Sequence, residues 1–277
     1  MRKLLAANFN RLRKDKFAWC VLAVVIIASF VSTFNSARSC EAMLNRGYVR
    51  SLDDYFFSQA PIMGACIALF ASTFLGTEYS DGTIRNKLIV GHRRIHVYLS
   101  NFVVCSVASL VMVFFWLLIS SLGIRLIGPL EMDATEFAAY LIIAVGVAIS
   151  FTALYTFIGC LSTNKAMTIT YTFIALMALV ITASGLWDRL CEPEMNEGMT
   201  YVNGEFVMPE PTPNPLYLSG MIRTVCEVAL ELLPTGQALL LSDVAIEYPV
   251  RAILLSVGFT TVTLLVGSRL FRRKDIK

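Results

Sequence analysis

Six uncharged and largely apolar stretches divide the chain into spans and connections. Each is about long enough to cross a hydrocarbon layer of roughly 30 Å as a helix, whose backbone hydrogen bonds are all made internally. The last stretch is the shortest, but Arg251 and Arg269 bracket it and can extend to the two membrane interfaces. The pattern predicts an all-α membrane protein with six transmembrane helices in one domain, residues 1–277. The predicted spans are residues 17–37, 55–77, 97–124, 137–164, 166–187 and 252–268.

The composition agrees with a lipid environment. Hydrophobic residues make up 56% of the 277 residues and charged residues only 16%, and the mean hydropathy is +0.66. The net charge of +3 does not favour nucleic acid as a partner, because the basic residues lie in short clusters beside apolar stretches. The first apolar stretch is too long for a cleaved signal peptide, and no small-x-small site ends it, so we expect it to remain as the first span.

Lysine and arginine residues in the connections set the predicted orientation. They gather before the first span, in the second and fourth connections and after the last span, whereas the third and fifth connections are acidic. Positive charge marks the cytoplasmic side, so both termini are predicted to be cytoplasmic. Residues 1–16 combine Leu4, Leu5, Phe9 and Leu12 with basic residues, which predicts an interfacial cytoplasmic helix on the inner leaflet. The cytoplasmic basic residues include Arg2, Lys3, Arg11, Arg13, Lys14 and Lys16, then Arg85, Lys87, Arg93 and Arg94, then Lys165, and in the tail Arg272, Arg273 and Lys274.

The fifth connection, residues 188–249, is the only sizeable stretch outside the spans and is predicted to be extracellular. Its first half is rich in proline, which breaks helices and indicates an extended loop. Its second half mixes apolar and charged residues, which predicts one or two short interfacial helices or, alternatively, a poorly packed loop. Cys40, Cys191 and Cys226 fall on the outer side, where a disulfide between two of them stays an open alternative.

The connection between the second and third spans, residues 78–96, carries the pattern most informative for function. Ser80 or Asp81 can cap the start of a helix, and Gly91 can end it. Ile84 and Leu88 stand four residues apart on one face. We predict a short amphipathic cytoplasmic helix that inserts Ile84 and Leu88 into a groove on a partner protein. The alternative is an interfacial helix that rests on anionic lipid through its basic residues.

The run from Glu78 to Leu88, with the sequence E-Y-S-D-G-T-I-R-N-K-L, is followed by Gly91, Arg94 and residues 98–100. This order resembles the cytoplasmic loop of bacterial type-2 ABC exporter permeases, a group that includes bacitracin and lantibiotic self-protection permeases. The basic N-terminal segment, the L-P-T-G-Q sequence at 233–237 and the F-R-R-K-D sequence at 271–275 are also similar to that family. The resemblance extends over the whole chain, and the loop motif is its most specific part.

The resemblance implies the transmembrane domain of a type-2 ABC exporter in a bacterial cytoplasmic membrane. Such a permease works with a second permease, an identical copy or a paralogue, and with separate cytoplasmic ABC ATPase subunits that bind ATP and Mg. This chain has no Gly-Lys pair followed by Ser or Thr, so we expect it to bind no cofactor and to be no enzyme by itself. In that family the loop after the second span docks against the ATPase. The residues carried over for this coupling role are Glu78, Asp81, Gly82, Thr83, Ile84, Arg85, Asn86 and Leu88.

Two interpretations of residues near or within the spans stay open. Glu78, at the inner end of the second span, is either a polar joint between the membrane and the coupling helix or a carboxylate that reaches headgroup water. Several residues on the second and fifth spans either line an adaptable substrate pathway in a dimer or serve ordinary helix packing. They are Met63, Phe70, Phe74, Thr168, Tyr171 and Phe173.

No ionisable residue lies in the middle of a predicted span, which argues against an ion-coupled transporter. His92 and His96 share one connection without further metal ligands, so no metal site and no membrane enzyme are predicted. The expected cargo is an amphipathic or hydrophobic compound, such as a peptide antibiotic or a lipid-like molecule, which links the chain to antibiotic resistance. The rival hypothesis is a non-transporting membrane sensor or assembly protein that uses residues 188–249 to bind a ligand or a second protein.

Overall fold

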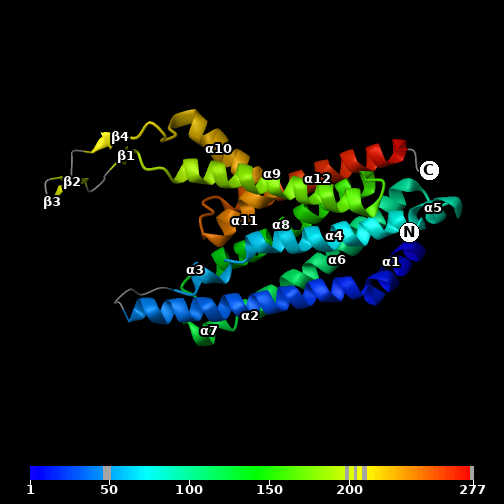
Figure 1. The fold of residues 1–277 in the computed structure, drawn as a ribbon, viewed down its shortest axis with the longest axis horizontal. Helices are drawn as coiled ribbons and strands as arrows, with labels where there is room; N and C mark the ends of the chain where they lie inside the picture. The colour runs from blue at the N-terminus through cyan, green and yellow to red at the C-terminus, as the bar shows by residue number, and fades with distance from the viewer. Residues whose placement is uncertain (46–50, 197–199, 203–204, 208–210, 275–277) are drawn as a thin grey trace.

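The computed structural model describes residues 1–277 with the exception of 46–50, 197–199, 203–204, 208–210 and 275–277. Its described part is almost entirely helical (Figure 1). The helices are α1 (Arg2–Lys14), α2 (Lys16–Leu44), α3 (Asp53–Phe56), α4 (Ala60–Ser80), α5 (Thr83–Ile89), α6 (Arg94–Ser120), α7 (Gly123–Leu126), α8 (Ala134–Leu161), α9 (Lys165–Cys191), α10 (Gly220–Leu232), α11 (Pro234–Ser242) and α12 (Pro249–Arg273). In the proline-rich loop, the short strands β1 (Met195–Asn196) and β4 (Thr212–Pro213) pair with each other, as do β2 (Thr200–Val202) and β3 (Glu205–Val207).

Six helices of the described chain, α2, α4, α6, α8, α9 and α12, are long and apolar enough to cross a membrane. They confirm the predicted all-α architecture with six spans. Some helices extend beyond the predicted limits: α2 runs to Leu44 instead of residue 37, and α12 begins at Pro249 instead of residue 252. Others are shorter at one end: α4 begins at Ala60 instead of residue 55, and α8 ends at Leu161 instead of residue 164. A helix need not stop where the hydrocarbon layer stops, because its backbone hydrogen bonds stay satisfied among the headgroups as well.

Short polar side chains and prolines fix where the long helices start. Asp15 begins α2, Asp133 begins α8 and Asn164 begins α9, and each side chain accepts a hydrogen bond from a backbone amide two or three residues ahead. Proline occupies the first turn of α4, α11 and α12, where its missing amide hydrogen costs nothing.

Helices α4 and α8 form the centre of the bundle (Figure 1). α4 packs against α8, α9 and α11, and α8 packs against α4, α6 and α12. In α4, 67% of the apolar window is buried, against 22% in α2, 22% in α9 and 17% in α12. These three outer helices therefore present apolar faces to lipid or to another membrane-embedded surface.

Helices α10 and α11 follow each other within the fifth connection, and the chain bends by 98° between them. We call this pair the α10–α11 hairpin. Both chain ends lie at the same end of the bundle (Figure 1), so the number of crossings is even and the hairpin returns to the side from which it enters. α11 is buried among α4, α8 and α9, where the Thr235 hydroxyl donates to the Leu179 carbonyl (3.0 Å). At Gly236 an added Cβ would lie 2.0 Å from the Leu230 carbonyl oxygen, so the close turn requires glycine. α11 thus enters the bundle more deeply than an interfacial helix.

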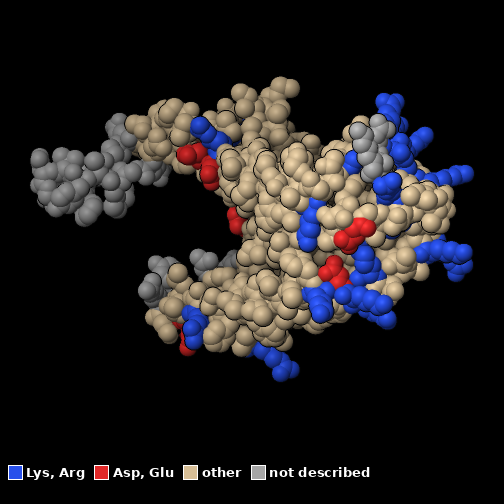
Figure 2. Space-filling model, turned by 45° about the vertical axis from the view of Figure 1, so that its right-hand side comes forward, with Lys and Arg blue, Asp and Glu red and all other residues tan. Residues whose placement is uncertain are grey.

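Lysine and arginine side chains gather around the end of the bundle that carries both termini (Figure 2). Because positive charge marks the cytoplasmic side, this distribution places both termini in the cytoplasm and the α10–α11 hairpin on the outer side. The chain is a multi-pass membrane protein.

Candidate functional site

Two glycines bound the short helix α5 at the cytoplasmic end. Gly82, with φ +64°, precedes it, and Gly91, with φ +92°, follows it. The Gly91 and His92 amides bond back to carbonyls in the last turn of α5 (2.9 and 3.2 Å), an arrangement that depends on a residue in the left-handed region. The predicted end at Gly91 is confirmed. The predicted cap is wrong, because Ser80 and Asp81 form the end of α4 and no side chain caps α5.

The predicted docking anchors on α5 face inward. Ile84 is only 1% exposed and packs with Leu4 of α1 in a small core at the cytoplasmic end, and Leu88 is half-buried against the same core. The residues that follow turn outward, and Ile89 and Val90 are 72% and 77% exposed. The four-residue spacing of Ile84 and Leu88 therefore marks the face that packs on this chain itself. This burial corrects the expectation that these two residues form the docking face.

The other residues carried over from the resemblance surround the start of α5. Asp81, Arg85 and Asn86 are exposed, whereas Gly82 and Thr83 are half-buried. The Thr83 hydroxyl donates to the Glu78 carbonyl (2.9 Å). The exposed members of this set are therefore accessible to a partner, and Thr83 ties the helix start to α4.

Glu78 is the centre of a polar network at the inner ends of the helices. Its side chain is 0% exposed and forms ion pairs with Arg11 of α1 and Lys87 of α5. The Asn101 amide of α6 donates a hydrogen bond to the other carboxylate oxygen (2.8 Å). A carboxylate enclosed in this way does not reach headgroup water, so that interpretation of Glu78 is wrong.

Asn8 completes the network from α1. It is buried, donates to the Ser100 hydroxyl (2.9 Å) and to Asn101 Oδ1 (2.8 Å), and accepts a hydrogen bond from Lys87 Nζ (2.8 Å). The network ties together four elements, α1, α4, α5 and α6. We call it the inner cluster, and its members are Asn8, Arg11, Glu78, Lys87, Ser100 and Asn101.

The inner cluster holds one more positive than negative charge. Arg11 and Lys87 share the single carboxylate of Glu78 near the carboxyl end of α4, whose helix dipole also favours cations. Arg11 in addition donates to the Phe74 carbonyl (2.5 Å) and covers the Phe74 ring at 3.7 Å. These contacts join α5 rigidly to α1 and α4, so a displacement of α5 can be passed on to the membrane helices.

The sequence identifies Glu78 but not its partners. Asn8 stands four residues after Leu4 on the buried face of α1, and a polar residue at a buried helix position signals a partner within the protein. Arg11 and Lys87 resemble ordinary cytoplasmic charges, because their pairing with Glu78 depends on tertiary packing. Arg11 and Glu78 stand 67 residues apart in the sequence, so no local pattern reveals that they form an ion pair.

A second cytoplasmic contact fastens the C-terminal tail to the bundle. Lys274, directly after α12, donates to the Tyr79 hydroxyl (3.1 Å) and to the Cys160 (3.1 Å) and Ser162 carbonyls at the end of α8. Burial lowers the pKa of Lys274 to about 8. The surrounding oxygens and the carboxyl end of α8 offset part of the cost of burying the ammonium group. Asp275, the last residue of the tail motif, lies outside the described residues.

Most of the predicted pathway residues are buried inside the single chain. They are Met63, Phe70, Phe74 and Thr168, each at most 5% exposed. Buried side chains cannot line a space between two copies, so in this conformation they serve helix packing, as the stacked rings of Phe70 and Phe74 show. On α9, Phe173 is half-buried and Tyr171 is exposed. Of the predicted set, Tyr171 is the residue that this conformation leaves accessible on the bundle surface.

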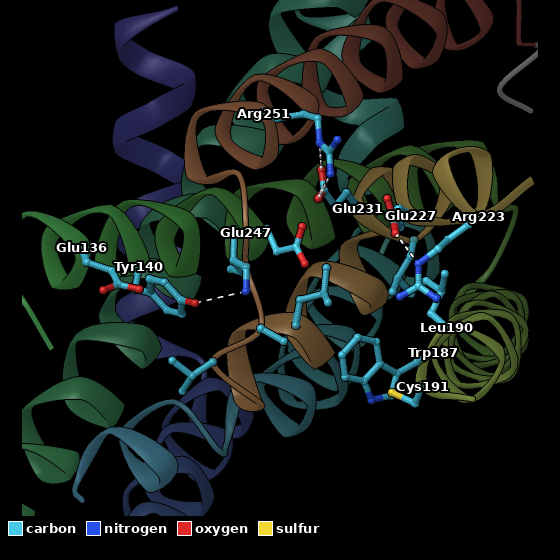
Figure 3. Close-up of a pocket in the computed structure, with 15 residues that line it drawn as sticks. Glu136, Tyr140, Trp187, Leu190, Cys191, Arg223, Glu227, Glu231, Glu247 and Arg251 are labelled. Carbon is cyan, nitrogen blue, oxygen red and sulfur yellow. Dashed lines mark hydrogen bonds and ion pairs between the residues drawn. The ribbon is translucent and has the colours of Figure 1, made fainter. Parts of the chain in front are cut away.

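At the opposite end, a cavity of about 300 Å³ lies between the α10–α11 hairpin and the outer ends of α8, α9 and α12 (Figure 3). Arg251 forms a two-armed ion pair with Glu231 (2.7 and 2.6 Å). Arg223 pairs with Glu227 at 3.1 Å, and Trp187 forms part of the wall. We call this space the outer cavity. Its walls combine charged, aromatic and aliphatic side chains, and it is open to the outer side, unlike the inner cluster.

Within the described residues, no group of three His, Cys, Asp or Glu side chains is placed to hold a metal ion. Cys191 and Cys226 are free thiols in this structure. Among the described residues, ion pairs, hydrogen bonds and apolar contacts hold the two ends of the bundle together.

Comparison with known families adds an independent observation. Residues 4–181 match the family model described as ABC-2 family transporter protein. The match covers more than half of the chain and includes α5 and every member of the inner cluster. The hairpin α10–α11 and helix α12 follow the matched region. No curated protein matches the chain.

Proposed function

Because this chain belongs to the ABC-2 family of transporter proteins, we propose that it is the permease subunit of an ATP-driven exporter whose ATPase subunits are separate cytoplasmic proteins. The observation that carries the proposal is the position of α5. It lies at the basic cytoplasmic end, exposes Ile89 and Val90, and is fastened to α1, α4 and α6 through the inner cluster. An ATPase that binds this tip can move the membrane helices.

The contact with the ATPase lies on the outward face of α5. Ile89 and Val90 form its apolar anchor, and the exposed Arg85 and Asn86 form polar contacts at its rim. Movement of the tip then passes through Lys87 to Glu78 and so to α4. ATP and Mg are bound by the partner ATPase, and this chain supplies the transmitting element.

A second permease, identical or paralogous, completes the pathway. α9 supports this part of the proposal, because Tyr171, Ile174, Met177 and Ile181 leave an apolar face exposed along it. The cargo is an amphipathic or hydrophobic compound, such as a peptide antibiotic of the kind handled by bacitracin and lantibiotic self-protection permeases, or a lipid-like molecule. The lack of ionisable residues in the middle of the predicted spans supports such a cargo over an ion.

The experiment that tests the ATPase contact is purification of the tagged chain from its native membrane, with mass spectrometry of the proteins that accompany it. We expect a soluble ABC ATPase in stoichiometric amount. Ile89→Ala combined with Val90→Ala should remove it. Two apolar side chains that become buried in the contact with the ATPase contribute about 3 kcal/mol, or about a hundredfold in affinity. The matched control, Met221→Ala with Ile222→Ala, truncates an equally exposed apolar pair at the opposite end of the bundle and should retain the ATPase.

The rival function, a non-transporting sensor or assembly protein, draws support from the outer cavity, which is a concave polar and aromatic space on the outer side. The same purification separates the two hypotheses. Recovery of a histidine kinase or another membrane protein, with no ATPase in repeated preparations, would contradict the exporter proposal and favour the sensor.

A further inference from the structure

A narrow apolar groove opens beside the elbow between α1 and α2, on the flank of the bundle. Its volume is about 360 Å³, and α1, α2, α4 and α6 supply its walls. Of the eleven described residues that line it, ten are apolar and one, Arg13, is charged. Trp19 lies over the elbow, where its indole donates to the Arg13 carbonyl (2.9 Å). The groove is therefore an apolar slot with a cation at one end.

The groove starts near the inner membrane interface and runs toward the middle of the bilayer. Asn101 on α6 is hydrogen-bonded to Glu78 and so marks the level of the inner cluster. Met112, at the deep end of the groove, follows on the same helix eleven residues later, about 16 Å along the axis. One leaflet contributes about 15 Å of hydrocarbon. The deep end of the groove thus lies about one leaflet from the level of the inner cluster, within reach of an acyl chain whose headgroup lies at the elbow.

The charge at the mouth fits an anionic headgroup. Lys14 and Lys16 are exposed beside Arg13, whereas the Asp15 carboxylate is used to cap α2. Three cations and one carboxylate leave the elbow with two positive charges. Arginine binds phosphate with two parallel hydrogen bonds, and basic residues near the inner leaflet attract anionic lipid.

We propose that this groove binds an anionic phospholipid of the inner leaflet, with one acyl chain against the exposed Trp19, Val107 and Val111 and the phosphate at Arg13. One wall of the groove belongs to α1, the helix that contributes two members of the inner cluster. Bound lipid therefore holds α1 in the position that the inner cluster requires.

The test uses Trp19 as a reporter in the full-length chain. The chain has three tryptophans, and Trp116→Phe with Trp187→Phe leaves Trp19 alone. The variant is reconstituted in phosphatidylcholine vesicles that contain phosphatidylglycerol, and either lipid is supplied with brominated acyl chains at the same mole fraction. Bromine quenches only tryptophan that it touches. We expect brominated phosphatidylglycerol to quench Trp19 more strongly, with a relative binding constant raised about fivefold by the single arginine.

Two variants in this background separate the headgroup from the acyl chain. Arg13→Gln should abolish the preference for phosphatidylglycerol, whereas its neighbour Lys14→Gln, outside the groove lining, should keep most of it. Val111→Phe fills the groove and should lower quenching by both lipids. Val180→Phe on α9 is the matched control, since Val180 is exposed to the same degree, 38% against 40% for Val111.

Equal quenching by the two brominated lipids, unchanged in Arg13→Gln and Val111→Phe, would overturn the proposal and leave only ordinary contact with surrounding lipid. Quenching that favours phosphatidylglycerol equally in Arg13→Gln and in the parent would also overturn it, because the headgroup would then lie elsewhere.

Discussion

The two ends of the bundle hold their charges in different ways. In the inner cluster the Glu78 side chain is 0% exposed, and it is shared by Arg11 and Lys87. Its partners Arg11 and Lys87 are 28% and 14% exposed. At the outer cavity Arg251 and Arg223 are 33% and 35% exposed, and their partners Glu231 and Glu227 are 5% and 32% exposed. A buried carboxylate that is shared by Arg11, Lys87 and Asn101 is held in one geometry, whereas a carboxylate with a single partly solvated partner can part from it at lower cost. This difference supports the proposal that the inner end transmits a movement of α5.

The two ends also differ in what they connect. The inner hydrogen bonds and ion pairs reach across as many as 93 residues and join four elements. The outer ion pairs reach across 4 and 20 residues and connect the α10–α11 hairpin to itself and to α12. One outer hydrogen bond, from the Ile246 amide to the Tyr140 hydroxyl of α8, reaches across 106 residues. Loss of the Glu78 carboxylate therefore disturbs contacts to three other helices, whereas loss of an outer ion pair loosens one junction.

The largest effect is expected from breaking the inner cluster at its centre. Glu78→Gln leaves Arg11 and Lys87 without a counter-charge beside a fully buried side chain, which should cost about 3 kcal/mol of stability. Thermal unfolding of the detergent-purified chain, followed by size-exclusion fluorescence, measures this loss. Glu227→Gln removes a carboxylate from the half-exposed outer pair and is the matched control; an equal loss in the two variants would contradict the distinction between the ends.

An apolar replacement sharpens the same comparison. Arg11→Met, Glu78→Leu and Lys87→Met together remove the charges without leaving any of them unpaired, so most of the stability lost in Glu78→Gln should return. Coupling to the ATPase should not return, because the directional contacts between α5 and α4 are gone. Recovery of both stability and ATP-driven transport would show that the polar geometry of the inner cluster has no role in transmission.

A smaller effect is expected at the outer junction between α10 and α12. Glu231→Gln removes the buried partner of Arg251, but the arginine is already one-third exposed and can regain water, so the loss should be about 1–2 kcal/mol. The same unfolding assay measures it, with Glu247→Gln at the rim of the cavity as the control. A loss as large as that of Glu78→Gln would mean that the outer end is as rigid as the inner end.

The smallest effect is expected at the surface of the hairpin. Arg223 and Glu227 form a half-exposed pair one helical turn apart, so Arg223→Gln should change stability by less than about 0.5 kcal/mol. The small difference should vanish at high salt. A salt-independent loss above that range would indicate that Arg223 supports the hairpin through contacts other than this ion pair.

The six spans are predictable because length and apolar character are properties of consecutive residues. The end of α5 at Gly91 is predictable for the same reason, since a glycine after an amphipathic turn is a local signal. The orientation of Ile84 is not, because a four-residue spacing reveals a buried face but not whether this chain or a partner covers it. Asn8 and Arg11 depend on α1 folding back against α4 and α6, and the depth of α11 depends on space left between other helices.

The most direct test of the account is the transport coupling of Lys87→Met in vesicles that contain the permease and its ATPase. Lys87 links α5 to Glu78 and Asn8, and its removal leaves Glu78 paired with Arg11, so the chain should still fold and bind the ATPase. The account predicts near-normal ATP hydrolysis and about tenfold less cargo moved per ATP, with Arg251→Met at the outer end retaining most of its coupling. A Lys87→Met permease that moves as much cargo per ATP as the unaltered chain would contradict the proposal that the inner cluster transmits the movement of α5.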